Sequence, residues 1–143
     1  MKSFLKYMII IMMVMISTLG VVSASELVEH NFDGKFTALA PDDGNFKEGG
    51  GFSYNWYTYE NQKISYLYGN FTGLGDNIEY IYSFLETEGF QKVNSDGNLT
   101  IFKIDNDDYG NYGVGVIQGD EFVCIAGDNL DQLEKIGNSV KFI

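Results

Sequence analysis

The sequence contains no arginine, and its nine lysines face 20 aspartates and glutamates in 143 residues. The formal net charge is therefore −11 at pH 7. Nucleic acids and anionic lipid headgroups are bound through phosphate neutralisation by lysine and arginine, so a negative field of this size opposes both. The charge excludes nucleic acid as an expected partner, and it is compatible with cationic partners or divalent ions.

Cysteine and histidine are equally scarce, because the chain has one of each, Cys124 and His30. One cysteine cannot form an internal disulfide, and one cysteine with one histidine cannot supply the four ligands of a structural zinc ion. The apolar run around Cys124, EFVCIAG, predicts a buried strand residue, with a reactive thiol as the alternative. His30 lies near the start of the expected mature chain. A flexible chain end holds a catalytic base poorly, so we expect His30 to be a surface residue without a catalytic role.

The first 24 residues have the pattern of a signal peptide for the Sec export pathway. Two lysines, Lys2 and Lys6, flank the start of an apolar stretch, and small residues of the form V-x-A follow it. Cleavage is expected after Ala24. The alternative is an uncleaved anchor, although this apolar stretch of about 16 residues is shorter than the roughly 20 that span a membrane. Either outcome predicts a secreted or cell-surface protein.

Removing 24 of the 143 residues leaves 119, residues 25–143, which is the size of a single domain. The loss of two lysines takes the net charge from −11 to −13. Without a disulfide or structural zinc, a domain of this size must be held together by its hydrophobic core.

Turn residues and apolar alternation predict strands that are joined mainly by hairpins. An extended segment over 31–41 is expected to end at Pro41, and a glycine-rich loop follows over 42–51. The aromatic-rich runs 52–59 and 63–71 predict a hairpin. Two more hairpins are expected, with turns at Asp96-Gly97 and Gly119-Asp120.

Two helices are predicted between these strands. The first begins with Asp76 as its N-cap, carries Ile78, Ile81, Tyr82 and Leu85 on one stripe, and ends at Gly89. The second is expected after Asp128, and a short strand closes the chain. The order is β-β-β-α-β-β-β-β-α-β. It predicts an α+β fold in which both helices pack on one face of an antiparallel sheet of about six to eight strands.

Two segments carry a resemblance to a known group of proteins. The opening FDGKFTALAP and the closing IAGDNLDQLEKIGNSVKFI resemble short exported proteins of methanogenic archaea, and the element order resembles that of small PsbP/Mog1-like α+β domains. The resemblance implies a binding or assembly role rather than catalysis, and it carries no catalytic residues to transfer.

The aromatic hairpin is the first candidate binding surface. Strand alternation places Tyr54 and Trp56 on one face, and Tyr57 and Tyr59 on the other. One face is expected in the core, and the other is a candidate contact for a surface glycan or a protein. The candidate binding residues are Tyr54, Trp56, Tyr57, Tyr59, Tyr66 and Tyr68.

The acidic stretch KIDNDDYGNYGVGV is the candidate metal site, with Asp105, Asp107 and Asp108 as ligands for Ca²⁺. Measured against an EF-hand loop, Tyr109 stands at position 5 and Val116 at position 12, where oxygen ligands are required. A looser calcium site therefore stays open, and a solvated acidic turn is the simpler alternative. No other cofactor is predicted.

Two further patterns concern modification and catalysis. Asn70 and Asn98 each begin an N-glycosylation sequon. An extracellular hydrolase could use two carboxylates at a defined separation. With 20 acidic residues in the chain, the sequence does not show which two these would be. The sequence favours an exported, non-enzymatic binding module. A calcium-stabilised envelope or adhesion component and a carboxylate-based hydrolase are the alternatives.

Overall fold

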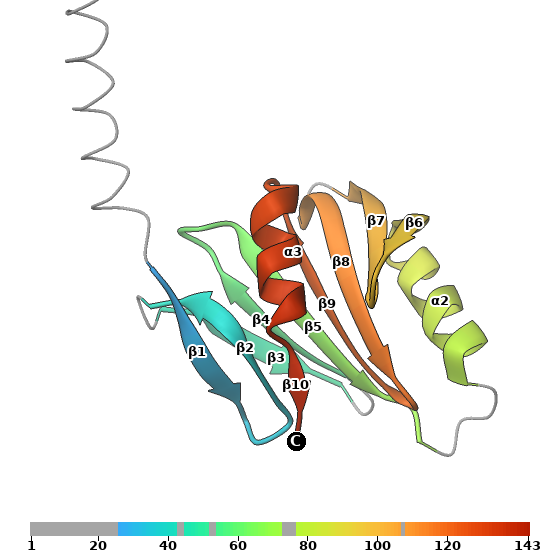
Figure 1. Cartoon of the computed structure of the whole chain (residues 1–143), viewed down its shortest axis with the longest axis horizontal. Coiled ribbons are helices and arrows are strands. Elements are labelled where there is room, and N and C mark those ends of the chain that lie inside the picture. Colours follow the sequence, from blue (N-terminus) through green and yellow to red (C-terminus); the bar gives the residue numbers. More distant parts are fainter. Residues whose placement is uncertain (1–25, 43–44, 52–53, 73–76, 107) are drawn as a thin grey trace, which may run out of the picture.

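The computed structural model describes residues 26–42, 45–51, 54–72, 77–106 and 108–143 (Figure 1). Within these residues the fold is α+β, with two helices and ten strands. The strands are β1 (Leu27–Phe32), β2 (Phe36–Pro41), β3 (Lys47–Gly50), β4 (Tyr54–Tyr59), β5 (Ile64–Asn70), β6 (Phe90–Asp96), β7 (Leu99–Asn106), β8 (Gly110–Gln118), β9 (Glu121–Gly127) and β10 (Lys141–Phe142). The helices are α2 (Asn77–Thr87) and α3 (Leu130–Asn138).

The strands form two antiparallel sheets. The larger sheet has seven strands in the order β3-β4-β5-β9-β8-β7-β6, and the smaller has three in the order β1-β2-β10. The predicted fold class and the size of the main sheet are therefore confirmed. The expected signal peptide over 1–24 lies outside the described residues. Within the described residues, neither helix has the length and apolar character needed to cross a membrane.

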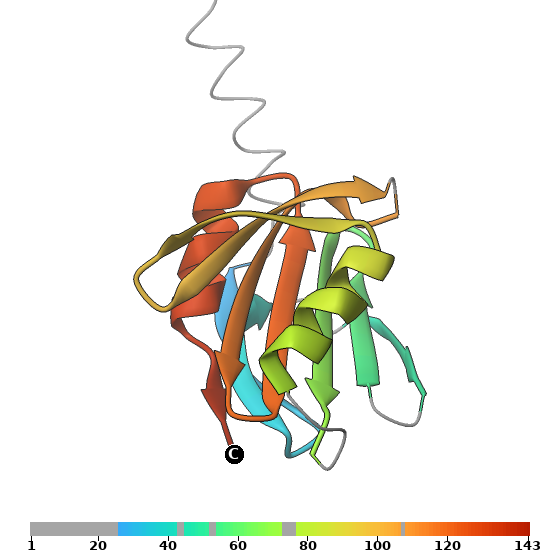
Figure 2. The same cartoon turned by 90° about the vertical axis from the view of Figure 1, so that its right-hand side faces the viewer.

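The prediction that both helices pack on one face of the sheet is wrong, because the seven-stranded sheet is covered on both faces (Figures 1 and 2). Along β9, Val123 and Ile125 join the core that includes residues of α3 and of the three-stranded sheet. Phe122, Cys124 and Ala126 point to the other face and join the core that includes residues of α2. A central strand that is apolar on both faces requires a cover on each side.

The order before the first helix also differs from the prediction, because five strands precede α2 instead of three. The expected extended segment over 31–41 is part of a hairpin, which turns at Asp33 and Gly34 with φ of 57° and 73°. The side chain of Asn31 accepts a hydrogen bond from the Gly34 amide at 2.7 Å and closes this turn. The predicted loop over 42–51 contains β3, whose two glycines give no strand signal in the sequence.

The two helices begin and end through local signals. In α3 the N-cap is Asn129, one residue after the predicted Asp128, and its side chain accepts from the Gln132 amide at 3.2 Å. The predicted N-cap of α2, Asp76, lies outside the described residues. Gly89 follows α2 with φ of 91°, the left-handed conformation that the sequence predicted at this end.

Aromatic side chains join the three-stranded sheet to the seven-stranded sheet. Phe36 is fully buried, with its ring stacked on Phe32 at a centroid distance of 4.5 Å and on Tyr68 at 5.7 Å. The Tyr66 hydroxyl donates a hydrogen bond to the Leu39 carbonyl oxygen at 2.7 Å. The layers are thus joined by ring packing and by a hydrogen bond of fixed geometry.

Replacing Tyr66 by phenylalanine is expected to lower the free energy of unfolding by about 0.5–1.5 kcal/mol, because the Leu39 carbonyl loses its donor. Chemical denaturation of the variant and the parent protein at pH 7 measures this difference. An unchanged stability would contradict the inferred contribution of the hydrogen bond.

The same substitution is expected to weaken the dependence of stability on alkaline pH. Burial, followed by the nearby Tyr59, raises the pKa of Tyr66 above its ordinary value of 10.0. The folded state then holds the phenolic proton more tightly than the unfolded state, so stability is fully present below pH 10 and decreases as the pH rises above it. Phenylalanine lacks this proton, and its unfolding free energy should fall less steeply above pH 10.

Candidate functional site

The six candidate aromatic residues are divided between the two faces of the main sheet. Four of them have their rings buried in the core beneath the three-stranded sheet, and they are Tyr57, Tyr59, Tyr66 and Tyr68. These four rings therefore offer no contact surface to a partner. Trp56, which is 36% exposed, and the half-buried Tyr54 lie on the opposite face, as the alternation predicted.

The candidate calcium ligands lie at the connection between β7 and β8. Asp105 and Asp108 are exposed, and Asp107 lies outside the described residues. The Asn106 side chain accepts a hydrogen bond from the Asp108 amide at 3.1 Å, which shapes the turn. Across the described part of the chain, no three or more His, Cys, Asp or Glu side chains are grouped so that they could hold a metal ion.

The two sequon asparagines are both exposed. Asn70 ends β5, and its side-chain oxygen accepts hydrogen bonds from the Thr72 amide at 3.0 Å and the Thr72 hydroxyl at 2.6 Å. Asn98 lies in the turn between β6 and β7. Both asparagines are thus placed where a glycan could be accommodated in solvent.

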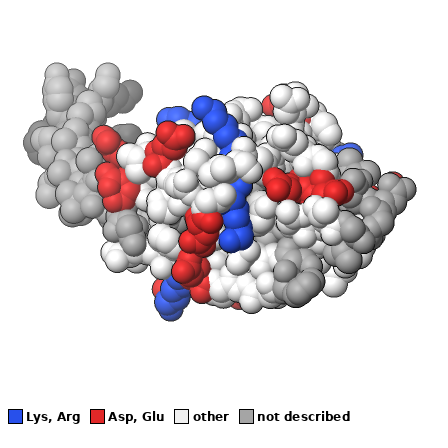
Figure 3. All heavy atoms as spheres, turned by 90° about the horizontal axis from the view of Figure 1, so that it is seen from below, with Lys and Arg blue, Asp and Glu red and all other residues white. Residues whose placement is uncertain are grey.

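Charged side chains of both signs share the surface. The face seen from below carries lysines interspersed with aspartates and glutamates (Figure 3). On that face the excess negative charge is therefore not gathered into one uniform patch.

Figure 2 shows α2 crossing one face of the seven-stranded sheet. The side chains on that face line a groove. We call it the α2-side groove, and its apolar lobe has a volume of about 200 Å³. The lobe is assembled from distant parts of the sequence, because its residues come from β4, β5, β6 and β9 and from the β7–β8 connection. Tyr66 takes part through its main chain, since its ring lies in the core on the other face. The ten described residues that line it are Trp56, Thr58, Ser65, Tyr66, Leu67, Phe90, Asp108, Tyr109, Cys124 and Ala126.

Small side chains make this part of the sheet hollow. The strand register places Ser65 of β5 beside Thr58 of β4 and Ala126 of β9. Ala126 is paired in turn with Gly113 of β8. On β4 and β5, the opposite face of the sheet carries the large tyrosine side chains of the core. Because a row of small residues cannot fill the space above the sheet, a cavity remains where α2 does not cover it.

Aromatic rings form the walls of the apolar lobe. On one side, Trp56 lies over Gly49 of β3, so closely that a Cβ at Gly49 would be 2.4 Å from the indole ring. On the other side, the Phe90 and Tyr109 rings pack with their centroids 5.7 Å apart. The glycine at position 49 therefore gives the Trp56 ring its position against the edge strand.

A polar lobe of about 600 Å³ continues the groove. The two lobes share four lining residues, Thr58, Ser65, Asp108 and Tyr109. Its charged lining residues are Glu60, Lys63, Asp105, Asp108 and Asp128. The groove thus changes from an apolar end to an acidic end across these shared residues.

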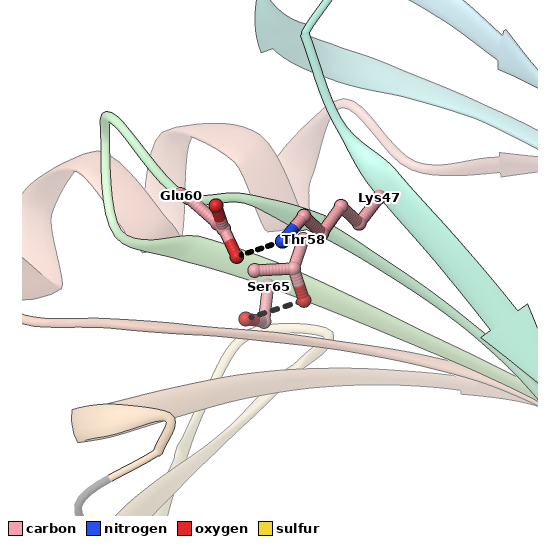
Figure 4. A network of polar contacts seen from close by, with 4 residues as sticks. All are labelled: Lys47, Thr58, Glu60 and Ser65. Atoms are coloured by element: carbon pink, nitrogen blue, oxygen red, sulfur yellow. Dashed lines mark hydrogen bonds and ion pairs between the residues drawn. The ribbon is translucent and has the colours of Figure 1, made fainter.

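Figure 4 shows two interactions that involve residues lining the groove. The Thr58 and Ser65 hydroxyl oxygens are 3.2 Å apart and form a hydrogen bond across the β4–β5 pair. Lys47 of β3 forms an ion pair with Glu60 at 3.0 Å. Both groups of this ion pair are largely exposed, so its contribution to stability is small.

Burial raises the pKa of two lining groups that are already mostly neutral at pH 7. It raises the pKa of the Cys124 thiol well above its ordinary value, so the floor of the groove offers no thiolate nucleophile. Burial, followed by the charges of Glu88 and Asp108, raises the pKa of Tyr109. His30 lies elsewhere, on β1, in edge contact with Phe32 at 4.6 Å. The lining therefore supplies apolar contact, hydroxyl groups and carboxylates.

No family model, curated protein or solved structure matches the chain. The class of the protein is thus defined by its own architecture. It is an α+β protein whose seven-stranded antiparallel sheet is covered on both faces, and it has a groove beside α2.

Five of the ten described residues of the apolar lobe stood out in the sequence, namely Trp56, Tyr66, Asp108, Tyr109 and Cys124. The other five residues carry no motif, because each is an ordinary strand residue in the sequence. For those on β5 and β9, the one local signal is the alternation of small and large side chains. That signal becomes informative when the register of the two strands is known.

Replacing Gly49 by alanine is expected to displace the Trp56 ring from β3 and to destabilise the protein by about 1–3 kcal/mol, as overpacking does. Trp56 is the sole tryptophan, so its emission maximum reports the displacement directly. Replacing the exposed Glu48, the neighbouring residue on β3, by alanine is the matched control. An emission spectrum unchanged by Gly49→Ala would show that this glycine does not position the ring.

Proposed function

We propose that this chain is an exported, non-enzymatic binding module whose ligand site is the α2-side groove. The observation that carries the proposal is the combination of a hollow, aromatic-walled lobe with an adjoining polar lobe. Ligand sites in proteins are typically concave and mainly apolar, with a few polar groups that orient the ligand. Export is supported by the signal-peptide pattern of the first 24 residues.

The walls of the groove favour a ligand with a flat or compact apolar part. Trp56 and Tyr109 offer partly exposed ring surface, and Leu67 offers an aliphatic side chain between the aromatic walls. Aromatic side chains contribute large contact areas with little loss of conformational entropy. The shared hydroxyl groups of Thr58 and Ser65 then provide hydrogen-bonding groups at the inner boundary of the polar lobe.

Binding of a neutral probe tests the proposal without assuming a charge preference. We expect 2-phenylethanol, titrated into the purified exported protein, to shift the NMR signals of the Trp56 indole N–H and the Tyr109 amide. Amide signals of Leu133 and Ile136 in α3 serve as internal controls, because that helix packs on the opposite face of the sheet. The proposal fails if the groove signals stay fixed, or if the α3 signals shift to the same extent.

The polar lobe supports a second candidate function, an extracellular hydrolase that uses carboxylates. Asp105, Asp108 and Asp128 line one hollow, and a pair of carboxyl groups on either side of a scissile bond is the usual arrangement in glycosidases. Screening with chromogenic glycosides tests this alternative. Hydrolysis that disappears in both Asp105→Asn and Asp108→Asn would favour the hydrolase, and hydrolysis that survives both substitutions would exclude these two acids.

A further inference from the structure

We propose that the α2-side groove selects small organic cations, which carry an ammonium group at one end of a compact apolar body. This inference rests on the proposed binding function and adds the chemical class of the ligand. The body would occupy the apolar lobe, and the ammonium group would point into the polar lobe.

The charge of the polar lobe is the first argument. Among the described residues, four carboxylates and one lysine line it, and they are Glu60, Asp105, Asp108, Asp128 and Lys63. The ion pair with Lys47 engages Glu60, so three carboxylates remain to oppose Lys63. The net charge of −11 on the chain adds a field of the same sign, which raises the local concentration of cations.

The boundary between the lobes is the second argument. An ammonium group held there would lie beside Tyr109, and Trp56 lines the adjoining apolar lobe; the ring faces of both residue types attract cations. The Thr58 and Ser65 hydroxyl groups lie 3.2 Å apart at the same boundary, and each oxygen can accept a hydrogen bond from N–H. Acceptors, ring faces and carboxylates therefore converge at the point where the apolar surface ends.

The same lining disfavours an anionic ligand. A carboxylate or phosphate placed in the polar lobe would face Asp105, Asp108 and Asp128, with Lys63 as the lining cation. A neutral hydroxylated ligand would gain hydrogen bonds from the same groups, but its affinity would not depend on ionic strength. Charge and salt dependence thus separate the three ligand classes.

Three probes with a common phenyl ring test the inference: 2-phenylethylamine, 2-phenylethanol and phenylacetate, which are cationic, neutral and anionic at pH 7. Trp56 fluorescence and calorimetry measure binding, because this tryptophan lies in the groove and is the sole one in the chain. We expect the amine to bind at least about tenfold more tightly than the alcohol, which is a difference within reach of a few partly screened charges. The anion should bind most weakly. The advantage of the amine should shrink as the salt concentration rises.

Two separate substitutions, Asp108→Asn and Asp105→Asn, each remove one charge with little change in shape. Each is expected to weaken amine binding about threefold to tenfold, as the loss of one partly screened charge does. Alcohol binding should weaken by a smaller factor, because the asparagine side chain can still form a hydrogen bond with a hydroxyl group. Asp131→Asn, on the exposed surface of α3, is the matched control and should change neither.

Equal affinity for the amine and the alcohol would overturn the cation preference and leave the binding function standing. An amine advantage that neither aspartate substitution reduces would also overturn it. If no probe shifts the groove signals, the binding function and the cation preference fall together.

Discussion

Replacing Phe36 by alanine is expected to lower the free energy of unfolding by about 3–5 kcal/mol. Phe36 is fully buried between the two sheets, where its ring stacks on Phe32 and on Tyr68. Alanine would leave a cavity where the three-stranded sheet meets the seven-stranded sheet. A loss of this size is a large share of the roughly 5–15 kcal/mol that stabilises a typical domain.

Urea denaturation followed by Trp56 fluorescence and by far-ultraviolet circular dichroism measures this effect. Trp56 lies on the seven-stranded sheet, on the face opposite to Phe36, so its fluorescence reports the main sheet. If the two sheets unfold together, both probes should give one coincident transition in the variant. Val93→Ala, at a side chain that is 62% exposed, is the control and should stay within about 0.5 kcal/mol of the parent protein. A loss below about 1 kcal/mol for Phe36→Ala would contradict the role assigned to this ring.

Filling the apolar lobe is expected to weaken ligand binding strongly while the fold is kept. Ala126 forms part of the floor of the α2-side groove, and leucine at this position would place three further carbon atoms in the hollow. We expect the affinity for 2-phenylethanol to fall at least about tenfold, which corresponds to about 1.4 kcal/mol. The melting temperature should not fall in parallel, because the added side chain gains apolar contacts in the hollow.

A second variant separates a blocked groove from a disturbed fold. Thr58→Leu enlarges another residue of the groove on a different strand, and it should weaken binding in the same direction. Gln118→Leu adds an apolar side chain at an exposed position of β8, outside the residues that line the groove, and serves as the control. Unchanged affinity in both groove variants would show that the ligand binds elsewhere.

The aromatic hairpin shows what strand alternation alone can predict and what it cannot. The alternation correctly placed Trp56 opposite Tyr57 and Tyr59, because side chains on a strand point in turn to its two faces. It could not decide which face would be covered. The three-stranded sheet covers the tyrosine face, and its contacts with β4 and β5 come from residues distant in the sequence, such as Leu39 with Tyr66.

The acidic connection between β7 and β8 shows a similar limit. Its composition suggested a calcium loop, and its spacing departed from the EF-hand pattern at Tyr109 and Val116. The structure brings Asp108 and Tyr109 to the groove beside Ser65 and Ala126. Their proximity depends on the pairing of β5 with β9, which no local pattern in the loop encodes.

The sequence by itself determined the elements with strong local signals. Turn residues predicted the hairpins between β6 and β7 and between β8 and β9, and apolar periodicity predicted α2 and α3. These signals are local because a turn type or a helix stripe depends on residues a few positions apart. The absence of arginine and the net charge of −11 likewise constrained the expected partners, because the sign of the overall field follows from composition.

The tertiary structure alone decided that α2 and α3 lie on opposite faces, that residues 27–41 form a hairpin, and that a groove remains beside α2. Each of these features depends on which distant strands pair and on which faces the helices cover. The groove exists because small residues from separate strands, among them Ser65 and Ala126, meet in one row of the sheet. Such a meeting is a property of register, which is fixed only when the whole sheet assembles.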